Sequence, residues 1–455
     1  MPASMSWKEM YRLEYDQLKG EGFDVSDMPK EDADAQTPVG YHLALESETD
    51  RAQMWREAYE RLLLCRQKGI RPDFGYNEPD GLEEIFALAD EPPKLVPVEG
   101  DEYADRVKGA WFARCASVLL GKPLEMGFDR LKVREYLESV DAYPLTDWVP
   151  ARSEKLNLTL REDCVPSTKG NVSYVQSDDD IHYTICSLLL AEKGGENFTR
   201  WQAAQNLLDN ITYNWVWTTD KFLYYQLVNC DSEREFEAKM DSGMILDNPW
   251  RESMCPQLKA DLWGYITPGE MRRGAKMIHR LGSLSASKNG LYGGMFMQGC
   301  VSAAMTRNPD VRSIIRGGLA NIPRTSRLHE AVLRVVDWYD ACGDWIEVCD
   351  KIYAEYGHWY FAGAINNICF IVLSLLEGNL DLEKTMCTAV MCGTDTDCNS
   401  GNAGSIVGAA VGYKALDQKW IAPLNDSVHS CVADFGFGSV TGLVDRTIEV
   451  YRKLH

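Results

Sequence analysis

Carboxylates are concentrated at two places in the sequence, and each place lies directly before a run with the composition of a helix. The stretch QSDDDIHYTICSLLLAE sets Asp178, Asp179 and Asp180 side by side. The stretch CGTDTDCNSGNAGSIVGAAVG sets Asp395 and Asp397 two residues apart, before a run of small residues. Adjacent carboxylates repel one another, so these two clusters indicate a compensating positive charge.

The residues alone allow two explanations of the first cluster, helix capping and metal binding. Ser177 or Asp178 is expected as the N-cap of the following helix, and acidic residues in a first helical turn stabilise it by about 0.3–1 kcal/mol. Three carboxylates exceed what capping needs. Oxygen-rich helix starts flanked by the hydroxyls of Ser177, Thr394 and Thr396 are typical of sites for a hard cation such as Mg²⁺ or Mn²⁺. Four or more carboxylates could hold two such ions.

The elements that must position these carboxylates are predicted to be helices. From about residue 101 onward, apolar and small residues recur at helical spacing and period-2 alternation is scarce. The clearest helical stretches are residues 101–121, 289–306, 329–342, 361–378 and 402–416. We therefore predict an all-α fold, an orthogonal multi-helix bundle with a binuclear metal site at helix N-termini.

Charge and composition exclude several classes of protein. The formal net charge of -21 argues against non-specific binding of nucleic acid and against docking on an anionic membrane. No apolar run approaches the length of a membrane span, and the N-terminus does not resemble a signal peptide. The 14 Cys are scattered, several within apolar helical stretches, which is typical of reduced thiols. A cytoplasmic location is expected, whereas the oligomeric state cannot be inferred.

The chain divides into two parts by composition. Residues 1–100 are acidic and only partly helical, with one helix expected in 51–69 and a short one within 80–97 that ends at Pro92 and Pro93, and we interpret them as an N-terminal extension. Residues 101–455 are predicted to form the catalytic domain. The sequence does not indicate whether the extension covers the site, binds a partner or only shields apolar surface.

Four motifs, in order, resemble those of the ADP-ribosylglycohydrolase family, the relatives of dinitrogenase-reductase-activating glycohydrolase. SDD at 177–179 is similar to the family's Thr-Asp-Asp motif, and GTDTDC at 393–398 to its Gly-Asp-Thr-Asp-Thr motif. GAWFARCASVLLGKPLE at 109–125 is similar to the family's opening helix, which ends in Gly-x-Pro-x-Glu. NGLYGGMF at 289–296 is a weaker match to its Asn-Gly-rich substrate loop. The resemblance covers roughly residues 105–450.

The resemblance implies an all-α hydrolase with a centre of two Mg²⁺ or Mn²⁺ ions. Glu125 is the implied acid/base, and Asp179 is a second catalytic carboxylate. The implied metal ligands are Ser177, Asp178, Asp179, Asp395, Asp397 and Cys398. The implied substrate-binding residues are Asn289, Gly290, Tyr292 and Gly293, with Asn366 added because a buried amide in an apolar helix needs a partner.

Four positions depart from the family pattern, and at two of them Ser177 and Asp180 each replace a Thr. Val118 stands where the family usually has an Asp, and Cys398 stands where a metal-binding Thr is usual. A thiol is a softer ligand than a hydroxyl and suits Mg²⁺ less well. These changes leave a metal centre plausible and leave the substrate open.

The implied reaction is metal-dependent hydrolysis of an N- or O-glycosidic bond at the anomeric carbon of ribose, on a small-molecule or protein-linked ribosyl substrate. Removal of ADP-ribose from a modified protein or small molecule is the leading interpretation. A second interpretation keeps the scaffold and takes a free nucleoside, nucleotide or other furanoside as substrate. A third is a non-catalytic sensor of ADP-ribose-like ligands.

Overall fold

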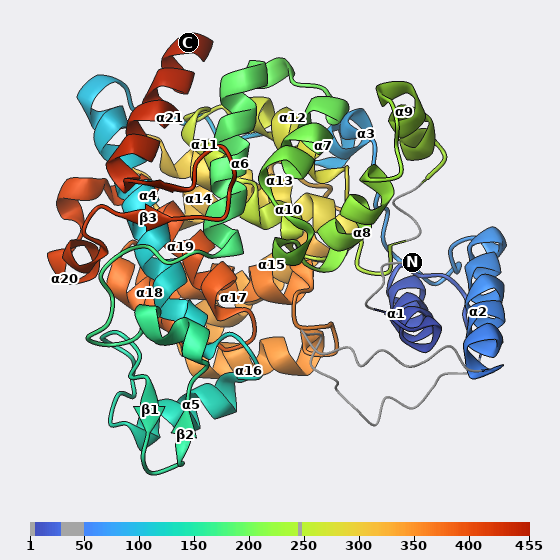
Figure 1. Cartoon of the computed structure of the whole chain (residues 1–455), viewed down its shortest axis with the longest axis horizontal. Helices are drawn as coiled ribbons and strands as arrows, with labels where there is room; N and C mark the ends of the chain where they lie inside the picture. The colour runs from blue at the N-terminus through green and yellow to red at the C-terminus, as the bar shows by residue number, and fades with distance from the viewer. Residues whose placement is uncertain (1–4, 29–49, 244–247) are drawn as a thin grey trace.

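The fold is built almost entirely from helices, as Figure 1 shows. The computed structural model describes residues 5–28, 50–243 and 248–455. The helices are α1 (Trp7–Gly20), α2 (Asp50–Leu63), α3 (Leu82–Leu88), α4 (Gly100–Gly121), α5 (Arg130–Ser139), α6 (Asp179–Gly194), α7 (Arg200–Asn210), α8 (Thr218–Leu227), α9 (Glu233–Asp241), α10 (Cys255–Leu258), α11 (Asp261–Tyr265), α12 (Met271–Gly282), α13 (Lys288–Ala304), α14 (Val311–Leu319), α15 (Arg327–Cys342), α16 (Trp345–Tyr356), α17 (Ala364–Gly378), α18 (Leu382–Met391), α19 (Thr396–Val411), α20 (Gln418–Ile421) and α21 (Val440–Leu454).

Strands play a minor part in the described residues. One antiparallel pair joins β1 (Arg152–Ser153) to β2 (Leu158–Thr159), and the other joins β3 (Val428–His429) to β4 (Phe437–Gly438). Each strand is too short to contribute a core layer, so the core is formed by packed helices. The prediction of an all-α architecture is confirmed.

Helices α4 and α19 approach each other closely along a seam of glycines. A Cβ on Gly408 would lie 2.3 Å from the carbonyl oxygen of Gly109, and a Cβ on Gly121 would lie 2.3 Å from that of Thr396. Only glycine fits at such distances. The Thr396 hydroxyl also donates a hydrogen bond of 2.7 Å to the Gly121 carbonyl oxygen. The seam therefore holds the C-terminus of α4 against the N-terminus of α19, where the second carboxylate motif lies.

Val118 lies in the same seam. It is fully buried on α4, and a Cβ on Gly401 of α19 would lie 2.6 Å from its Cγ2. The side chain at this position therefore packs between the two helices. An apolar residue suits such a dry contact, since a carboxylate there would lose its solvation.

The N-terminal helices pack on the main body through a separate apolar cluster. This cluster combines residues of α1 and α2, such as Tyr11 and Leu62, with Phe222 and Trp250 of the main body. In Figure 1, α1 and α2 lie side by side at one edge of the molecule. The extension expected at residues 1–100 therefore contacts the main body, although residues 1–4 and 29–49 are outside the described range.

Buried ion pairs fix α1 to the main body. The guanidinium of Arg251 donates to a carboxylate oxygen of Glu14 at 2.8 Å and to one of Glu21 at 2.7 Å, and all three side chains are almost fully buried. Gln17 of α1 donates to Glu252 at 2.8 Å. Although burial opposes it, the charge of Arg251 lowers the pKa of Glu21 to about 2. Arg251 therefore ties both carboxylates of this segment to the main body, while Arg66 also donates to Glu14 at 2.6 Å and Lys288 lies 3.8 Å from Glu21.

We expect Arg251→Met to lower the free energy of unfolding by about 3–5 kcal/mol, because it removes the buried cation that Glu14 and Glu21 share. Urea denaturation followed by tryptophan fluorescence measures this loss. The control is Arg56→Met, which removes an exposed partner of Glu60 and should cost less than about 1 kcal/mol. Equal effects of the two substitutions would contradict the prediction.

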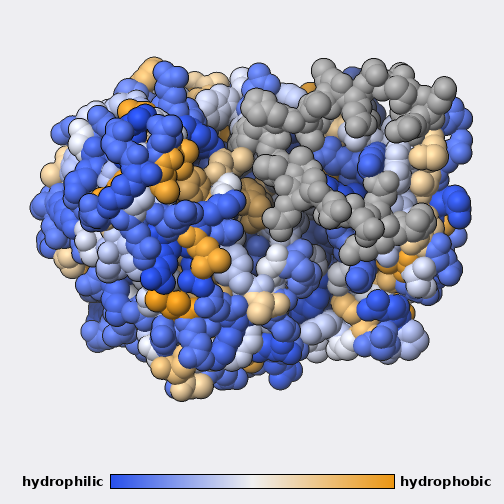
Figure 2. All heavy atoms as spheres, turned by 90° about the horizontal axis from the view of Figure 1, so that it is seen from below, coloured by the Kyte–Doolittle hydropathy of each residue, from blue (hydrophilic) through white to orange (hydrophobic). Residues whose placement is uncertain are grey.

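The face drawn in Figure 2 is mainly hydrophilic, with apolar residues in small scattered groups. Among the described residues, the helices include none that is long and apolar enough to cross a bilayer.

Candidate metal centre

The first carboxylate cluster lies at the start of α6. Asp178 is the N-cap, and its Oδ1 accepts a hydrogen bond of 3.0 Å from the backbone N–H of Asp180. Asp178 and Asp180 are buried, whereas Asp179 is partly exposed. One carboxylate oxygen from each of the three residues lies within 4.8 Å of the others. Capping therefore uses one of the three carboxylates and leaves the other two for another role.

The second cluster lies at the start of α19. Asp395 is the N-cap residue but makes no side-chain capping hydrogen bond, and Asp397 and Cys398 lie in the first turn. The thiol of Cys398 and carboxylate oxygens of Asp397 and Asp180 lie within 4.8 Å of one another. Two segments that are more than 200 residues apart in sequence thus meet at one point.

Glu125 completes the centre from the end of α4. Its carboxylate lies within 4.8 Å of ligand atoms of Asp395 and Asp397, and it keeps 16% of its side chain exposed. The guanidinium of Arg161 lies 3.4 Å from the Glu125 carboxylate. The structure therefore brings Glu125, Asp178, Asp179, Asp395, Asp397 and Cys398 close together, and their roles as ligands or catalytic groups stay predictions.

Two charged residues of the centre, Lys122 and Arg161, were missed by the sequence reasoning. Lys122 forms a buried ion pair with Asp178 and donates a hydrogen bond of 3.3 Å to the Ser177 carbonyl oxygen. Asp180 belongs to the first carboxylate cluster but was not among the implied metal ligands, and Arg161 was not considered. A lysine between Gly121 and Pro123, at the end of an otherwise apolar helix, was the available signal.

A buried arginine secures the start of α6. Arg114 of α4 donates from Nη2 to the Asp180 carbonyl oxygen at 2.7 Å and to its Oδ1 at 3.2 Å, and from Nη1 to Asp261 at 2.9 Å. All three side chains are fully buried. Arg114 thus links α4, α6 and α11 behind the centre and fixes one oxygen of Asp180.

The carboxylates of the centre have perturbed proton affinities. Burial, and then the charge of Asp178, raises the pKa of Asp397 from 3.8 to about 6, although Lys122 opposes this shift. Burial and neighbouring carboxylates also raise the pKa values of Glu125, Asp179 and Asp395. Burial raises that of Asp180, against the effect of Arg114. The centre therefore holds more negative charge than its own lysine and arginines balance.

Unsatisfied oxygens indicate that a cation fits this centre. Oδ2 of Asp180 and Oδ1 of Asp395 are buried and have no hydrogen-bond partner among the described residues. A buried carboxylate oxygen without a partner is costly. Both residues belong to sets that share Asp397, so oxygen ligands converge at a spacing suited to a divalent ion.

The remaining expected ligand, Ser177, has a different contact. Its hydroxyl lies 2.8 Å from Nε2 of His182. Burial lowers the pKa of His182 to about 4, so this imidazole is neutral at physiological pH. The Ser177 hydroxyl therefore lies beside the centre but contacts the His182 side chain of α6.

The residues expected to bind substrate at 289–293 are occupied by other parts of the chain. Asn289 donates to Glu78 at 2.8 Å and to Glu252 at 2.7 Å, and its oxygen accepts from the Leu328 N–H at 3.0 Å. The Tyr292 hydroxyl donates to the Pro79 carbonyl oxygen. The side chains of Asn289 and Tyr292 therefore contact segment 78–79 and Glu252, and none of these contacts is to a carboxylate of the metal centre.

Gly290 and Gly293, in the same stretch, allow other parts of the chain to pack closely against α13. A Cβ on Gly290 would lie 2.5 Å from the Arg251 carbonyl oxygen, and one on Gly293 would lie 2.8 Å from the Gln257 side chain. On α17, Asn366 donates to the Tyr360 carbonyl oxygen at 3.3 Å. Its neighbour Asn367 contacts the second motif, since its side-chain oxygen accepts a hydrogen bond from the Thr394 hydroxyl at 3.3 Å and one from Asn399, just beyond the motif, at 2.9 Å.

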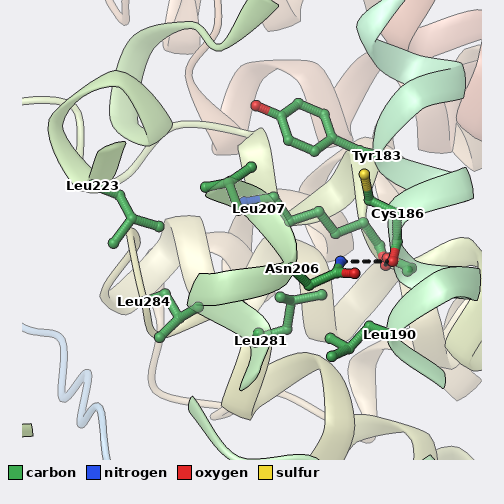
Figure 3. Close-up of a pocket in the computed structure, with 11 residues that line it drawn as sticks. Tyr183, Cys186, Leu190, Asn206, Leu207, Leu223, Leu281 and Leu284 are labelled. Carbon is green, nitrogen blue, oxygen red and sulfur yellow. Dashed lines mark hydrogen bonds between the residues drawn. The ribbon is translucent and has the colours of Figure 1, made fainter. Parts of the chain in front are cut away.

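A small pocket lies farther along α6. Figure 3 shows Tyr183, Cys186 and Leu190 of α6 facing Asn206 and Leu207 of α7, with Asn206 donating to the Cys186 carbonyl oxygen at 3.0 Å. Its lining is largely apolar and includes none of the metal-centre residues. The pocket is therefore separate from the carboxylate centre.

Comparison with models of known protein families identifies the family of this chain. Residues 99–453 match the family model described as ADP-ribosylglycohydrolase. The chain belongs to the ADP-ribosylglycohydrolase family. The resemblance seen in the four motifs is thereby confirmed, and it indicates glycohydrolase activity on ADP-ribose-like substrates. Residues 1–98 lie outside the match.

A solved structure named "ADP-ribosylglycohydrolase-related protein complex" is similar to this chain. The two chains are 16% identical with a TM-score of 0.46, over 78% of this chain and 99% of the other. The search of curated proteins returned no match.

Metal binding should stabilise the protein more at neutral than at acidic pH. A raised carboxyl pKa means that the folded state binds the proton more tightly, so this contribution to stability is present below pH 3.8 and is lost as the pH rises towards about 6. A divalent ion restores it at neutral pH because it binds the deprotonated carboxylates. At 100 times its Kd, we expect Mn²⁺ to raise the melting temperature by roughly 3–8 °C at about pH 7.5 and by much less at about pH 5.

Differential scanning fluorimetry with Mn²⁺ or with chelator measures this difference across the pH range. Asp397→Asn serves as the control, since it removes a shared carboxylate. A gain in melting temperature that is the same at both pH values, or that persists in the variant, would contradict the prediction.

Proposed function

We propose that this chain is a divalent-metal-dependent glycohydrolase that cleaves an N- or O-glycosidic bond at the anomeric carbon of ribose. Removal of ADP-ribose from a modified protein or small molecule is the proposed reaction. The observation that carries the proposal is the convergence of Glu125, Asp180, Asp395 and Asp397, with two buried oxygens that have no partner. Family membership supplies the class of substrate.

The residues proposed to hold metal are Asp179, Asp180, Asp395, Asp397 and Cys398. A bound divalent cation would supply a Lewis acid that fixes the ribose hydroxyls. Four of these residues offer hard carboxylate oxygens and one offers a thiol, so we expect Mn²⁺ to bind more tightly than Mg²⁺.

Glu125 is proposed as the proton donor. It is the partly exposed carboxylate at the end of α4, and burial and Asp397 raise its pKa, so that it retains a proton to higher pH. It would pass that proton to the leaving nitrogen or oxygen as the glycosidic bond breaks. Water then adds to the anomeric carbon and loses a proton to a carboxylate, with Asp179 as our candidate once a bound cation offsets the neighbouring charges that raise its pKa. Arg161 would orient the Glu125 carboxyl group.

The test is incubation of purified protein and Mn²⁺ with ADP-ribosyl-arginine, ADP-ribosyl-serine peptide, O-acetyl-ADP-ribose, nucleosides and aryl furanosides. Mass spectrometry identifies the products, and chelator provides the metal-free control. Release of free ADP-ribose that depends on metal supports the proposal. Normal turnover in excess chelator would contradict it.

A smaller furanoside is the second candidate substrate, and one observation favours it. Asn289 and Tyr292, which the family resemblance assigns to substrate binding, are occupied by Glu78 and Pro79 of the chain itself. A ligand that needs these groups would have to displace segment 78–79. Release of base or sugar from nucleosides or aryl furanosides, without action on ADP-ribosyl compounds, would support this alternative.

A further inference from the structure

Two sets of ligand atoms in the carboxylate centre share Asp397. Asp180, Asp397 and Cys398 form one set, and Glu125, Asp395 and Asp397 form the other. Within each set the ligand atoms lie within 4.8 Å of one another. A carboxylate that belongs to both sets has two oxygens with which to bridge two neighbouring ions. The two sets are therefore treated as two ion sites that meet at Asp397.

Each set contains one buried oxygen that lacks a partner. Asp180 accepts a hydrogen bond from Arg114 through Oδ1 at 3.2 Å, whereas its Oδ2 has no hydrogen-bond partner among the described residues. Asp395 makes no capping hydrogen bond, and its Oδ1 is likewise unpaired in that part of the chain. A buried carboxylate oxygen is costly unless something positive binds it. One cation in each set accounts for both oxygens.

The two sets differ in the chemistry of one ligand. The set with Asp395 consists of three carboxylates, and carboxylate oxygens are the hard donors that Mg²⁺ and Mn²⁺ prefer. The set with Asp180 has the sulfur of Cys398 in place of a third carboxylate. Thiolate sulfur is a soft donor that favours Zn²⁺ over Mg²⁺. Three protein ligands with one open position are also the arrangement of catalytic zinc sites.

Cys398 differs in its surroundings from the other cysteines of the chain. Cys300 and Cys369 are buried in the middle of α13 and α17, where a cysteine packs as a small apolar residue. Cys398 is also buried, with 7% exposed, but in residues 5–28, 50–243 and 248–455 it is the one cysteine whose sulfur belongs to a ligand set. Apolar packing does not account for a thiol beside two carboxylates.

We propose that the set with Cys398 binds a thiophilic divalent ion, Zn²⁺ or Co²⁺, through a direct sulfur–metal bond, whereas the set with Glu125 binds Mg²⁺ or Mn²⁺. On binding, the S–H bond of Cys398 breaks, the sulfur–metal bond forms and the proton passes to the buffer. The centre then holds two ions of different chemistry, bridged by Asp397. This inference rests on the metal dependence of the proposed function and not on its substrate.

Spectroscopy with Co²⁺ tests the sulfur–metal bond directly. The full chain is stripped of metal with chelator and titrated with Co²⁺ in the presence of Mg²⁺, which fills the set of three carboxylates. A sulfur-to-cobalt charge-transfer band in the near ultraviolet should grow and saturate at one Co²⁺ per chain. Bound Co²⁺ without this band would overturn the inference alone. Binding of no divalent ion would overturn both the inference and the metal part of the proposed function.

Cys398→Thr is the decisive variant, because it restores the residue type that the family motif usually has. The band should disappear, and Zn²⁺ should bind at least ~10-fold more weakly, since even partners outside the coordination shell change metal affinity by about 10–100-fold. Mn²⁺ should still bind. Cys342→Ser is the matched control, because this half-buried cysteine at the end of α15 belongs to no ligand set among the described residues. A band that persists in Cys398→Thr would overturn the proposal, as would its loss in Cys342→Ser.

X-ray absorption at the zinc edge keeps the inference testable if Cys398→Thr does not fold. The parent chain, loaded with one Zn²⁺ in the presence of Mg²⁺, should show a sulfur neighbour at about 2.3 Å from the zinc. A shell of oxygen and nitrogen neighbours alone, at about 2.0–2.2 Å, would overturn the inference. Sulfur-bound zinc in a chain that turns over no ribosyl substrate would leave the inference standing and count only against the proposed function.

Discussion

Asp397→Asn is expected to lower kcat/KM for the ribosyl substrate by at least ~10³-fold, equivalent to about 4 kcal/mol of transition-state stabilisation. Asp397 is the carboxylate that lies in both ligand sets, one with Asp180 and Cys398 and the other with Glu125 and Asp395. Its replacement by a neutral amide removes a shared ligand and weakens every proposed metal contact. Steady-state kinetics in saturating Mn²⁺ measures the loss.

The same variant should lose the rise in melting temperature with Mn²⁺. Asp179→Ala is expected to behave similarly, because its carboxylate lies beside that of Asp180. The control is Asp163→Asn, an exposed carboxylate near the centre with 65% of its side chain accessible. Parent-level turnover in Asp397→Asn, measured in protein shown to be folded by circular dichroism, would remove the metal centre from the mechanism.

Glu125→Gln should lower kcat by about 10²–10⁴-fold, the usual contribution of a positioned acid or base. The amide has nearly the same shape as the carboxyl group but cannot donate the proton to the leaving group. Because Glu125 is proposed to act in its protonated form, activity of the parent protein should fall as the pH rises through its raised pKa. That limb of the pH profile should be absent from the variant.

The measurement is kcat against pH for the parent protein, Glu125→Gln and the control Glu162→Gln, which alters an exposed neighbour on the adjacent turn. Mn²⁺ binding by Glu125→Gln should stay within about tenfold of the parent value, since Gln keeps an oxygen at that position. If the variant instead loses both metal and activity, Glu125 is a metal ligand and the proton donor is another group.

Much of the architecture could be predicted from the chain itself. Helical periodicity identified α4, α13, α15, α17 and α19, because the burial of an apolar face is a local property of sequence. The two carboxylate motifs were visible for a related reason, since each cluster is contiguous and precedes a helix. Their meeting in space followed from the family resemblance rather than from any local pattern.

The N-terminal part shows what local sequence patterns cannot predict. Sequence indicated two helices in residues 51–90, and α2 and α3 lie there. It could not show that Arg251 would bind Glu14 and Glu21, or that Glu78 would bind Asn289, because these partners are more than 200 residues apart. The substrate-loop prediction at 289–293 remains a prediction for this reason. Its residues have the expected types, but the chain's own segment 78–79 uses their hydrogen-bonding groups.

The sequence by itself determined the all-α class, the family and the carboxylates at the starts of α6 and α19. Only the tertiary structure decided which carboxylates are already neutralised. Asp178 and Asp180 are two residues apart and chemically identical, yet Asp178 is saturated by Lys122 and a cap, whereas Asp180 retains a buried oxygen without a partner. The physical reason is that charge compensation acts over a few ångströms in space, and the close packing of α4 against α19 sets those distances.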